Sequence, residues 1–175
     1  MLKDPADEGG CSIRIRRFKP EDINQIKNVA RAAFDSEVDK YWSVVGALRT
    51  PYTYIAEICG KIIGVIEFEL VYLSRSSEGH IGYIFVHPEY QGKGVGTALL
   101  KKAEEILYRR GARRIWAVTS PNNPKTRRFF EKNGYREVST KIMKKTLGSN
   151  NTKKLLRRMV YFKGDIIHVK ELSSN

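Results

Sequence analysis

The stretch "YQGKGVGTALLKKAEEIL", from Tyr90 to Leu107, decides the fold because it sets three glycines at the mouth of an amphipathic helix. Glycine is a poor helix former, yet apolar residues three and four positions apart begin directly after the cluster. The run "YIFV", typical of a strand, ends a few residues upstream. A strand, a glycine loop and a helix N-terminus in this order favour phosphate binding, since backbone N–H groups and the helix dipole face the anion. A plain turn is the alternative for any single glycine, but three together favour a phosphate cradle.

The composition is that of a globular protein of single-domain size. The chain has 175 residues, of which 41% are hydrophobic, and no apolar run approaches the roughly 18–20 residues of a membrane span. The opening "MLKDPADEGG" has no apolar targeting stretch, so we expect a cytoplasmic protein with a disordered segment over residues 1–11. Cys11 and Cys59 are far apart and form no CxxC pair, which favours reduced thiols over a disulfide or a metal site.

Charge is distributed unevenly along the chain. Residues 1–75 carry 11 Lys and Arg against 11 Asp and Glu, whereas residues 76–175 carry 21 against 8, which accounts for the whole net charge of +13. Such an excess indicates an anionic partner: a phosphorylated cofactor, an acidic substrate or nucleic acid. A solvated surface that only aids solubility is the alternative, and charge alone favours it.

Periodicity predicts one α/β domain over residues 12–162, built around a mixed sheet. Helices are expected at Pro20–Phe34, Glu37–Arg49 and Thr97–Arg110, and over "NPKTRRFFEKNG" with Asn123 as N-cap. Strands are expected at Ser12–Phe18, on both sides of a Cys59-Gly60-Lys61 hairpin turn, over "HIGYIFVHP" and "RRIWAVTS", and as a closing pair, Tyr135–Met143 and Leu156–Phe162. Residues 163–175 are expected to form a C-terminal extension, in which "GDIIHVKEL" adds one more short strand.

Two motifs resemble those of the GNAT N-acetyltransferase superfamily. "VHPEYQGKGVGTALL" resembles the family's acetyl-coenzyme A motif, Q/R-x-x-G-x-G/A after a strand that ends in V-x-P, with Gln91, Gly94 and Gly96 at its defined positions. "NPKTRRFFEKNGY" resembles the second motif, N-x-x-A-x-x-x-Y-x-x-x-G-F, and begins at Asn123. The resemblance covers roughly residues 12–162 and implies a single GNAT-like domain, a mostly antiparallel sheet flanked by helices.

The resemblance also implies a co-substrate, acetyl-coenzyme A, with no metal. Backbone groups of Ile84, Phe85 and Val86 would pair with the pantetheine arm like an added strand, the logic of β-augmentation. Asn123 would reach the pantetheine from the other side, or it would serve only as a helix N-cap. The expected loop around the pyrophosphate consists of Gln91, Gly92, Lys93, Gly94, Val95, Gly96 and Thr97.

Acyl transfer to an amine needs a base, because a lysine amine with a pKa of about 10.4 is protonated at neutral pH. In the family the base is often a carboxylate eleven residues before the first Gln or Arg of the motif, and this count leads from Gln91 to His80. Glu78 is a neighbouring candidate, and Glu67 and Glu69 on the preceding strand are others. An ordinary residue at a strand start is the alternative for His80, and it is favoured.

Phe130 departs from the second motif, where the family has a tyrosine that is taken to protonate the departing thiolate. Phenylalanine cannot donate a proton, although a thiolate with a pKa near ~8.5 leaves readily without help. The expected function is therefore an N-acetyltransferase that acts by direct attack of an amine on the thioester, with Phe130 still lining the cofactor. The alternative is a non-catalytic acyl-coenzyme A-binding module.

The acceptor is expected to be a primary amine on a small molecule, a peptide or a protein N-terminus, including an acidic or ribosome-associated partner. Around the second helix the chain carries five aromatic residues that line an acceptor site or, as favoured, mostly belong to the core: Phe34, Tyr41, Trp42, Tyr52 and Tyr54. No membrane partner is expected. Nucleic acid binding through the basic C-terminal half is a less favoured reading, and the C-terminal strands offer an edge for a homodimer.

Overall fold

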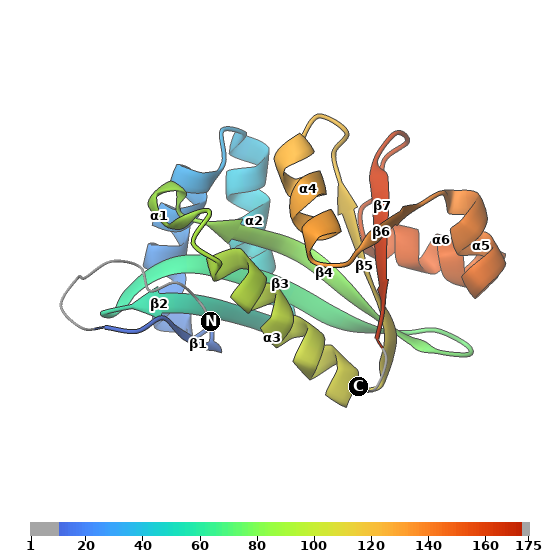
Figure 1. Cartoon of the computed structure of the whole chain (residues 1–175), viewed down its shortest axis with the longest axis horizontal. Coiled ribbons are helices and arrows are strands. Elements are labelled where there is room, and N and C mark those ends of the chain that lie inside the picture. The colour runs from blue at the N-terminus through green and yellow to red at the C-terminus, as the bar shows by residue number, and fades with distance from the viewer. Residues whose placement is uncertain (1–10, 173–175) are drawn as a thin grey trace. The chain divides into compact units, whose positions relative to one another are not determined.

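The computed structural model describes residues 11–172, so the expected N-terminal disordered segment lies outside it except for Cys11. Seven strands form one sheet in the order β1-β2-β3-β4-β5-β7-β6 (Figure 1). The β4–β5 pair is parallel, and the pairs β1–β2, β2–β3, β5–β7 and β6–β7 are antiparallel. The predicted fold class, an α/β domain with a mixed and mostly antiparallel sheet, is confirmed.

The helices and strands alternate much as the sequence predicts up to residue 138. The strands are β1 (Arg14–Arg17), β2 (Tyr52–Ile58), β3 (Lys61–Tyr72), β4 (Ser77–Val86), β5 (Ala112–Thr119), β6 (Arg136–Val138) and β7 (Ile166–Glu171). The α-helices are α1 (Ile23–Ala33), α2 (Glu37–Arg49), α3 (Val95–Arg109), α4 (Pro124–Lys132), α5 (Thr140–Leu147) and α6 (Ser149–Arg158). Short 3-10 turns, η1 (Pro20–Asp22) and η2 (Pro88–Tyr90), precede α1 and α3. Within residues 11–172, no helix is long and apolar enough to span a bilayer.

The chain divides into two compact units, and strands β3 and β4 contribute to both. The first unit contains the residues up to Glu69 and Gly82–Glu105. Its core forms where the apolar faces of α1 and α2 cover β2 and β3, because residues three and four apart on a helix share one face. The buried members of this core are Ile26, Val29, Ala30, Ala47, Ile55, Ile62, Val65 and Phe85.

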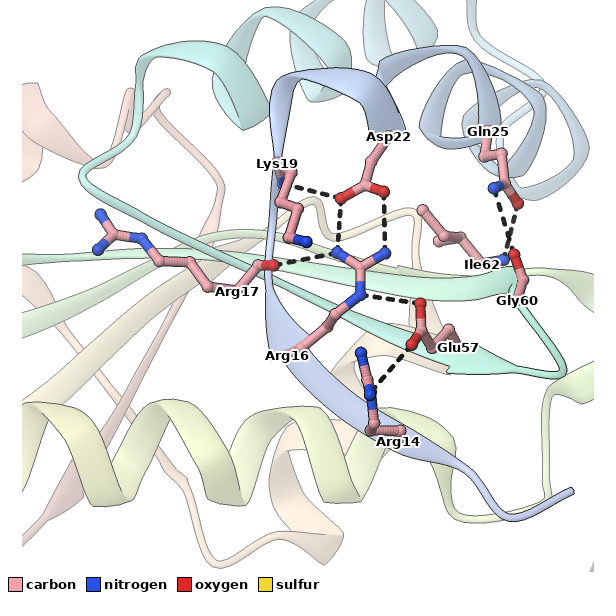
Figure 2. Close-up of polar contacts among 9 residues, drawn as sticks. All are labelled: Arg14, Arg16, Arg17, Lys19, Asp22, Gln25, Glu57, Gly60 and Ile62. Carbon is pink, nitrogen blue, oxygen red and sulfur yellow. Dashed lines mark hydrogen bonds and ion pairs between the residues drawn. The ribbon is translucent and has the colours of Figure 1, made fainter.

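An arginine network fixes the first strand to the turn before α1 (Figure 2). Both terminal nitrogens of Arg16 donate to the Asp22 carboxylate, at 2.7 and 2.9 Å, and its Nε donates to Glu57 at 2.8 Å. The hydrogen bond from Arg16 holds the pKa of Asp22 below its usual value. Gln25 closes the hairpin turn between β2 and β3, since its side chain donates to Gly60 O and accepts from the Ile62 amide.

The two cysteines form a disulfide, so the expectation of reduced thiols is wrong for this structure. Arg14 of β1 pairs with Glu57 of β2, and this register brings Cys11 beside the β2–β3 turn that contains Cys59. Their Cα atoms lie 5.6 Å apart, within the usual range for a bridge. Spacing along the sequence could not reveal this contact, because it depends on pairing between strands about 40 residues apart.

Two of the aromatic residues predicted to be core lie on the surface. Tyr41 and Trp42 of α2 are 62% and 49% exposed and pack against each other at 5.2 Å. The buried positions of α2 are the small residues Ser43 and Ala47. The core expectation is therefore wrong for Tyr41 and Trp42, because α2 turns its small residues inward.

The second unit contains Leu70–Ile81 and the chain from Ile106 onward. The expected closing strands at Tyr135–Met143 and Leu156–Phe162 are wrong beyond Val138: α5 and α6 occupy this region as adjacent helices (Figure 1). The closing strand is β7, which lies between β5 and β6. The expected C-terminal extension thus supplies an interior strand of the sheet.

Candidate active site

The glycine loop adopts a backbone that other residues reach only with strain. Gly92 and Gly94 have φ of +75° and +84°, which L-residues with a Cβ rarely adopt. Helix α3 begins at Val95, and the Ala98 amide donates to Gly94 O. The amides of residues 95–97 precede the closing of the first helical turn and have no partner inside the helix. The loop therefore presents bare backbone N–H groups at the positive end of a 15-residue helix.

Side chains around the loop add positive charge and fix the strand end. Gln91 Nε2 donates to Val86 O at 2.8 Å, which ties the loop to the last residue of β4. The ammonium groups of Lys61 and Lys93 lie 5.4 and 5.3 Å from the centre of the Tyr90 ring. Lys61 and Lys93 thus place two cations at the rim of the glycine loop, where each contacts the buried Tyr90 ring.

The β4 strand changes its pairing partway along its length. It pairs in parallel with β5 only as far as His80, opposite Trp116, and continues for six further residues to Val86. Over this second half the described β4–β5 ladder has no further rungs. The backbone of Ile84–Val86 therefore has a strand edge on which an extended chain can pair.

Glu67 of β3 is a buried carboxylic acid, and among the residues that the structure describes no counter-charge contributes to its pKa. The side chain is 2% exposed, and within the described residues its Oε1 has no hydrogen-bond partner. Burial raises its pKa to about 9. A Cβ at Gly46 of α2 would collide with Glu67 Oε2, so the glycine makes room for the carboxyl group.

The next strand adds a tyrosine to the same unit. The hydroxyl of Tyr83 donates to Asp39 Oδ1 of α2 at 3.1 Å. Burial, assisted by the Asp39 charge, raises the pKa of Tyr83 above its usual value, so the phenol stays protonated. The ring packs edge-on against Phe34 at 5.8 Å. Burial thus raises the pKa values of both Glu67 and Tyr83 in the first unit. Perturbed pKa values of this kind are common at functional sites.

In the second unit, Glu78 has partners that suit a structural role. Arg114 donates to both of its carboxylate oxygens, at 3.0 and 2.6 Å, and Trp116 Nε1 donates at 2.8 Å. Ser76 Oγ donates at 2.6 Å. These hydrogen bonds engage both carboxylate oxygens and fix the side chain within its own unit. His80 is 8% exposed and lies opposite Trp116 in the ladder.

The second motif forms helix α4 as predicted. Asn123 is its N-cap, with Oδ1 accepting from the Thr126 amide at 3.1 Å. Phe130 is 2% exposed and stacks on His168 at 5.2 Å. His168 Nε2 lies 2.8 Å from Thr119 Oγ1, and burial lowers the pKa of this imidazole. Phe130 thus packs against a neutral histidine in the core of this unit.

The loop residues and the end of β4 lie together in the first unit. Glu78 and His80 lie in the first half of β4, which belongs to the second unit. Sequence reasoning included Glu67 among four candidates but could not single it out. It missed Gly46, which makes room for that carboxyl group, and Tyr83. No local pattern marks Tyr83, because its hydrogen bond to Asp39 depends on how α2 packs.

The family comparison agrees with this geometry. The family model described as "Acetyltransferase (GNAT) family" matches residues 22–135. An uncharacterised N-acetyltransferase of Methanocaldococcus jannaschii is 30% identical over 129 residues, which cover 70% of this chain and 78% of that protein. The family-model match contains the glycine loop and strands β2 to β5.

Two solved structures have the same fold. The PaiA N-acetyltransferase of Thermoplasma acidophilum, in complex with coenzyme A, is similar with a TM-score of 0.68 at 20% identity, over 92% of this chain and 99% of that one. The ribosomal-protein-S18-alanine N-acetyltransferase of Escherichia coli has a TM-score of 0.68 at 18% identity, over 94% and 96%. The chain belongs to the GNAT family and is an acyltransferase that uses acetyl-coenzyme A.

Proposed function

We propose that the protein transfers the acetyl group to a primary amine of a peptide or protein, by direct attack of the amine on the thioester. The observation that carries the proposal is the bare-backbone loop between β4 and α3. Its amides from Gly92 to Thr97 would bind the pyrophosphate, and Lys61 and Lys93 would add charge at the rim. The edge of Ile84–Val86 would hold the pantetheine.

In this reaction the amine nitrogen bonds to the carbonyl carbon and the carbon–sulfur bond breaks. The amine must first lose a proton, and we assign that proton to Glu67. Burial raises the pKa of Glu67 to about 9, so at neutral pH most of the carboxyl groups already carry a proton and only the ionised fraction can accept one from the amine. The rate should therefore rise with pH toward about 9. The thiolate leaves without a proton donor, because its own pKa near ~8.5 makes it a stable anion. The presence of phenylalanine at position 130, where the family has a tyrosine, should therefore lower the rate only slightly.

The surface of α2 supports a peptide acceptor over a small molecule. Val38, Tyr41, Trp42 and Leu48 are 65%, 62%, 49% and 57% exposed. At about 3.6 residues per turn, positions 38, 41, 42 and 48 fall on one side of the helix, so they form an apolar stripe. Exposed stripes of this kind usually contact another molecule. The E. coli structure that shares this fold is an enzyme for a ribosomal protein, which is consistent with a protein acceptor.

A panel of amines tests the acceptor class, with free-thiol release from acetyl-coenzyme A as the readout. We expect turnover with peptides that have a free α-amino group and with few small amines. Trp42→Ala should raise KM for peptides and leave KM for acetyl-coenzyme A unchanged. Efficient turnover of a small amine, unaffected by Trp42→Ala, would exclude the peptide assignment while leaving acetyl transfer in place.

Two variants decide which residue is the base. Glu67→Gln should lower kcat by roughly 10²–10⁴ and remove a limb of the pH–rate profile near the pKa of about 9. His80→Ala should leave that limb in place. If His80→Ala abolishes the rate and Glu67→Gln retains it, the base is the histidine that the family motif predicts.

A further inference from the structure

A strongly basic helical hairpin lies outside both family motifs. We define the basic hairpin as residues 139–164, which contain α5 and α6. The segment carries eight Lys and Arg and no Asp or Glu. These eight account for a large part of the net charge of +13, and nothing in the acetyl transfer described above requires them. A cluster with one sign of charge attracts polyanions.

The α6 helix collects its cations on a single face. Lys153, Lys154, Arg157 and Arg158 recur at the three- and four-residue spacing of one helical face. With Asn150 they line a surface hollow of about 400 Å³. Lys154 Nζ donates to Tyr72 O at 2.7 Å, so one cation is fixed in place. From Asn150 to Arg158 the row spans about 12 Å of helix axis, enough for several phosphates of a nucleic acid chain.

The opposite face of the hairpin is fixed in the core of the second unit. Met143, Leu147, Leu155 and Met159 are all buried there. Asn151 adds a bond from its side-chain amide to Ser74 Oγ at 2.9 Å. A helix that lies in a membrane surface needs its apolar face for the lipid, and here that face is occupied by protein. The cationic face therefore suits a polar polyanion better than a bilayer.

A strained turn follows the last cation of α6, and it carries exposed side chains. The Tyr161 amide donates to Leu156 O and the Val160 amide to Arg157 O, which is a Schellman motif with Val160 in the position that usually belongs to glycine. Val160 has φ of +53°, an outlier for a β-branched residue. The turn leaves Phe162 68% exposed, and Asp165 Oδ2 accepts from its amide at 2.8 Å.

We propose that the basic hairpin is a docking surface for single-stranded RNA. The cations of α6 bind the phosphates, and the Phe162 ring stacks on a base. Proteins that bind single strands combine a positive groove with exposed aromatic rings in this way. An acidic peptide could neutralise the cations but would have no base for the ring.

A fluorescent 20-nucleotide single-stranded RNA of mixed sequence tests the proposal on the full chain. With about four phosphate contacts, the plot of log K against log salt should have a slope of about −3. Lys153→Gln/Arg157→Gln should weaken binding by about tenfold or more and reduce the magnitude of the slope by about 1.4, since two contacts are lost. Phe162→Ala should weaken binding about tenfold and leave the slope unchanged.

The matched control is Lys27→Gln/Arg31→Gln, which removes the same two residue types at the same spacing from exposed positions of α1. It should leave RNA affinity unchanged. Equal losses in the two double variants would show a general effect of net charge and overturn the proposal. Poly-glutamate binding as tight as RNA, with no effect of Phe162→Ala on either, would also overturn it. So would binding to phosphatidylserine vesicles in the absence of RNA binding.

Discussion

Burying Glu67 without a counter-charge links the stability of the protein to pH. In the unfolded chain this carboxyl group titrates at its ordinary value of 4.5, and in the fold burial raises the pKa to about 9. Between those values the folded state keeps a proton that the unfolded state releases. The free energy of unfolding therefore decreases as pH rises, by at most about 1.4 kcal/mol per pH unit. The contribution is fully present below pH 4.5 and is lost as pH rises through about 9.

Glu67→Gln should remove this dependence, because the amide has nearly the same shape and never ionises. Urea unfolding between about pH 5 and 8 is the measurement, and the wild-type protein should lose a few kcal/mol more than the variant across that range. Glu105→Gln, which changes a partly exposed carboxylate beside Lys102, is the control and should behave like wild type. Parallel curves for all three proteins would show that Glu67 is ionised in the fold.

The chemistry of this residue was only partly predictable from the sequence. A glutamate in a β-rich run is visible, and it belonged to a short set of candidate bases. Its protonation state depends on Gly46 of α2, which makes room for the carboxyl group, and on the burial of this part of β3. Both arise from packing between elements that are distant in sequence, so no local pattern reports them.

Among the elements, the glycine loop offers the most direct test of cofactor binding. Gly94 and Gly111 have φ of +84° and +85°, so alanine at either position strains the backbone equally, by about 1–2 kcal/mol. Gly94 is in the loop, whereas Gly111 follows the C-terminal end of α3. Gly94→Ala should weaken coenzyme A binding tenfold or more by isothermal titration. Gly111→Ala should lower Tm as much as Gly94→Ala does, but it should bind coenzyme A as tightly as the wild-type protein. If the two variants bind coenzyme A with equal affinity, the phosphate site does not lie in the loop.

The turn after α6 gives an element whose stability can be raised. Val160→Gly should stabilise the protein by about 0.5–1 kcal/mol, because relief of the left-handed strain exceeds the added entropy of the unfolded chain. Val160 is 66% exposed, so little packing is lost. Val38 of α2 is 65% exposed, and Val38→Gly should instead destabilise a helix. Chemical denaturation measures both signs, and a destabilising Val160→Gly would show that the turn is not strained.

The hairpin of α5 and α6 shows why the last third of the chain was hard to predict. Apolar residues here are sparse, so a run such as Leu156–Phe162 alternates well enough to suggest a strand. The pairs Met143/Leu147 and Leu155/Met159 carry the helical spacing of four, and Ser139 caps α5 through the Ile142 amide. These signals are short, and tertiary packing on the sheet decides between the two readings. In contrast, the long periodic pattern of α3 and its glycine loop is local, and it was predicted within two residues.

At the scale of the molecule, the order of elements and two short motifs were enough to predict the fold class and the family. The β4–β5 crossover through α3 needs a parallel pair, which the sequence order strand–loop–helix–strand already implies. The place of β7 between β5 and β6 is different, because it requires the chain to return after the basic hairpin and pair with two strands at once. Only the assembled sheet shows why a segment at the end of the chain belongs in its interior.

The disulfide conflicts with the reduced thiols expected from the sequence, and its effect on stability can be measured. Cys11 and Cys59 are separated by 48 positions, and closing a loop of this length restricts the unfolded chain by about 4 kcal/mol. Cys11→Ser/Cys59→Ser should lower the free energy of unfolding by that order, and dithiothreitol should lower Tm of the wild-type protein alone.

Mass spectrometry after thiol alkylation checks the redox state directly, with the double variant as the unreactive control. A bridge retained in protein purified under non-reducing conditions would place it either in an oxidising compartment or in a hyperthermophilic cell interior, where intracellular disulfides are common. Two alkylated cysteines, together with a Tm that dithiothreitol does not change, would restore the reduced thiols that their spacing in the sequence favours. Because β1 is also held by Arg16, Asp22 and Glu57, the strand should stay paired in either case, and only the stability should change.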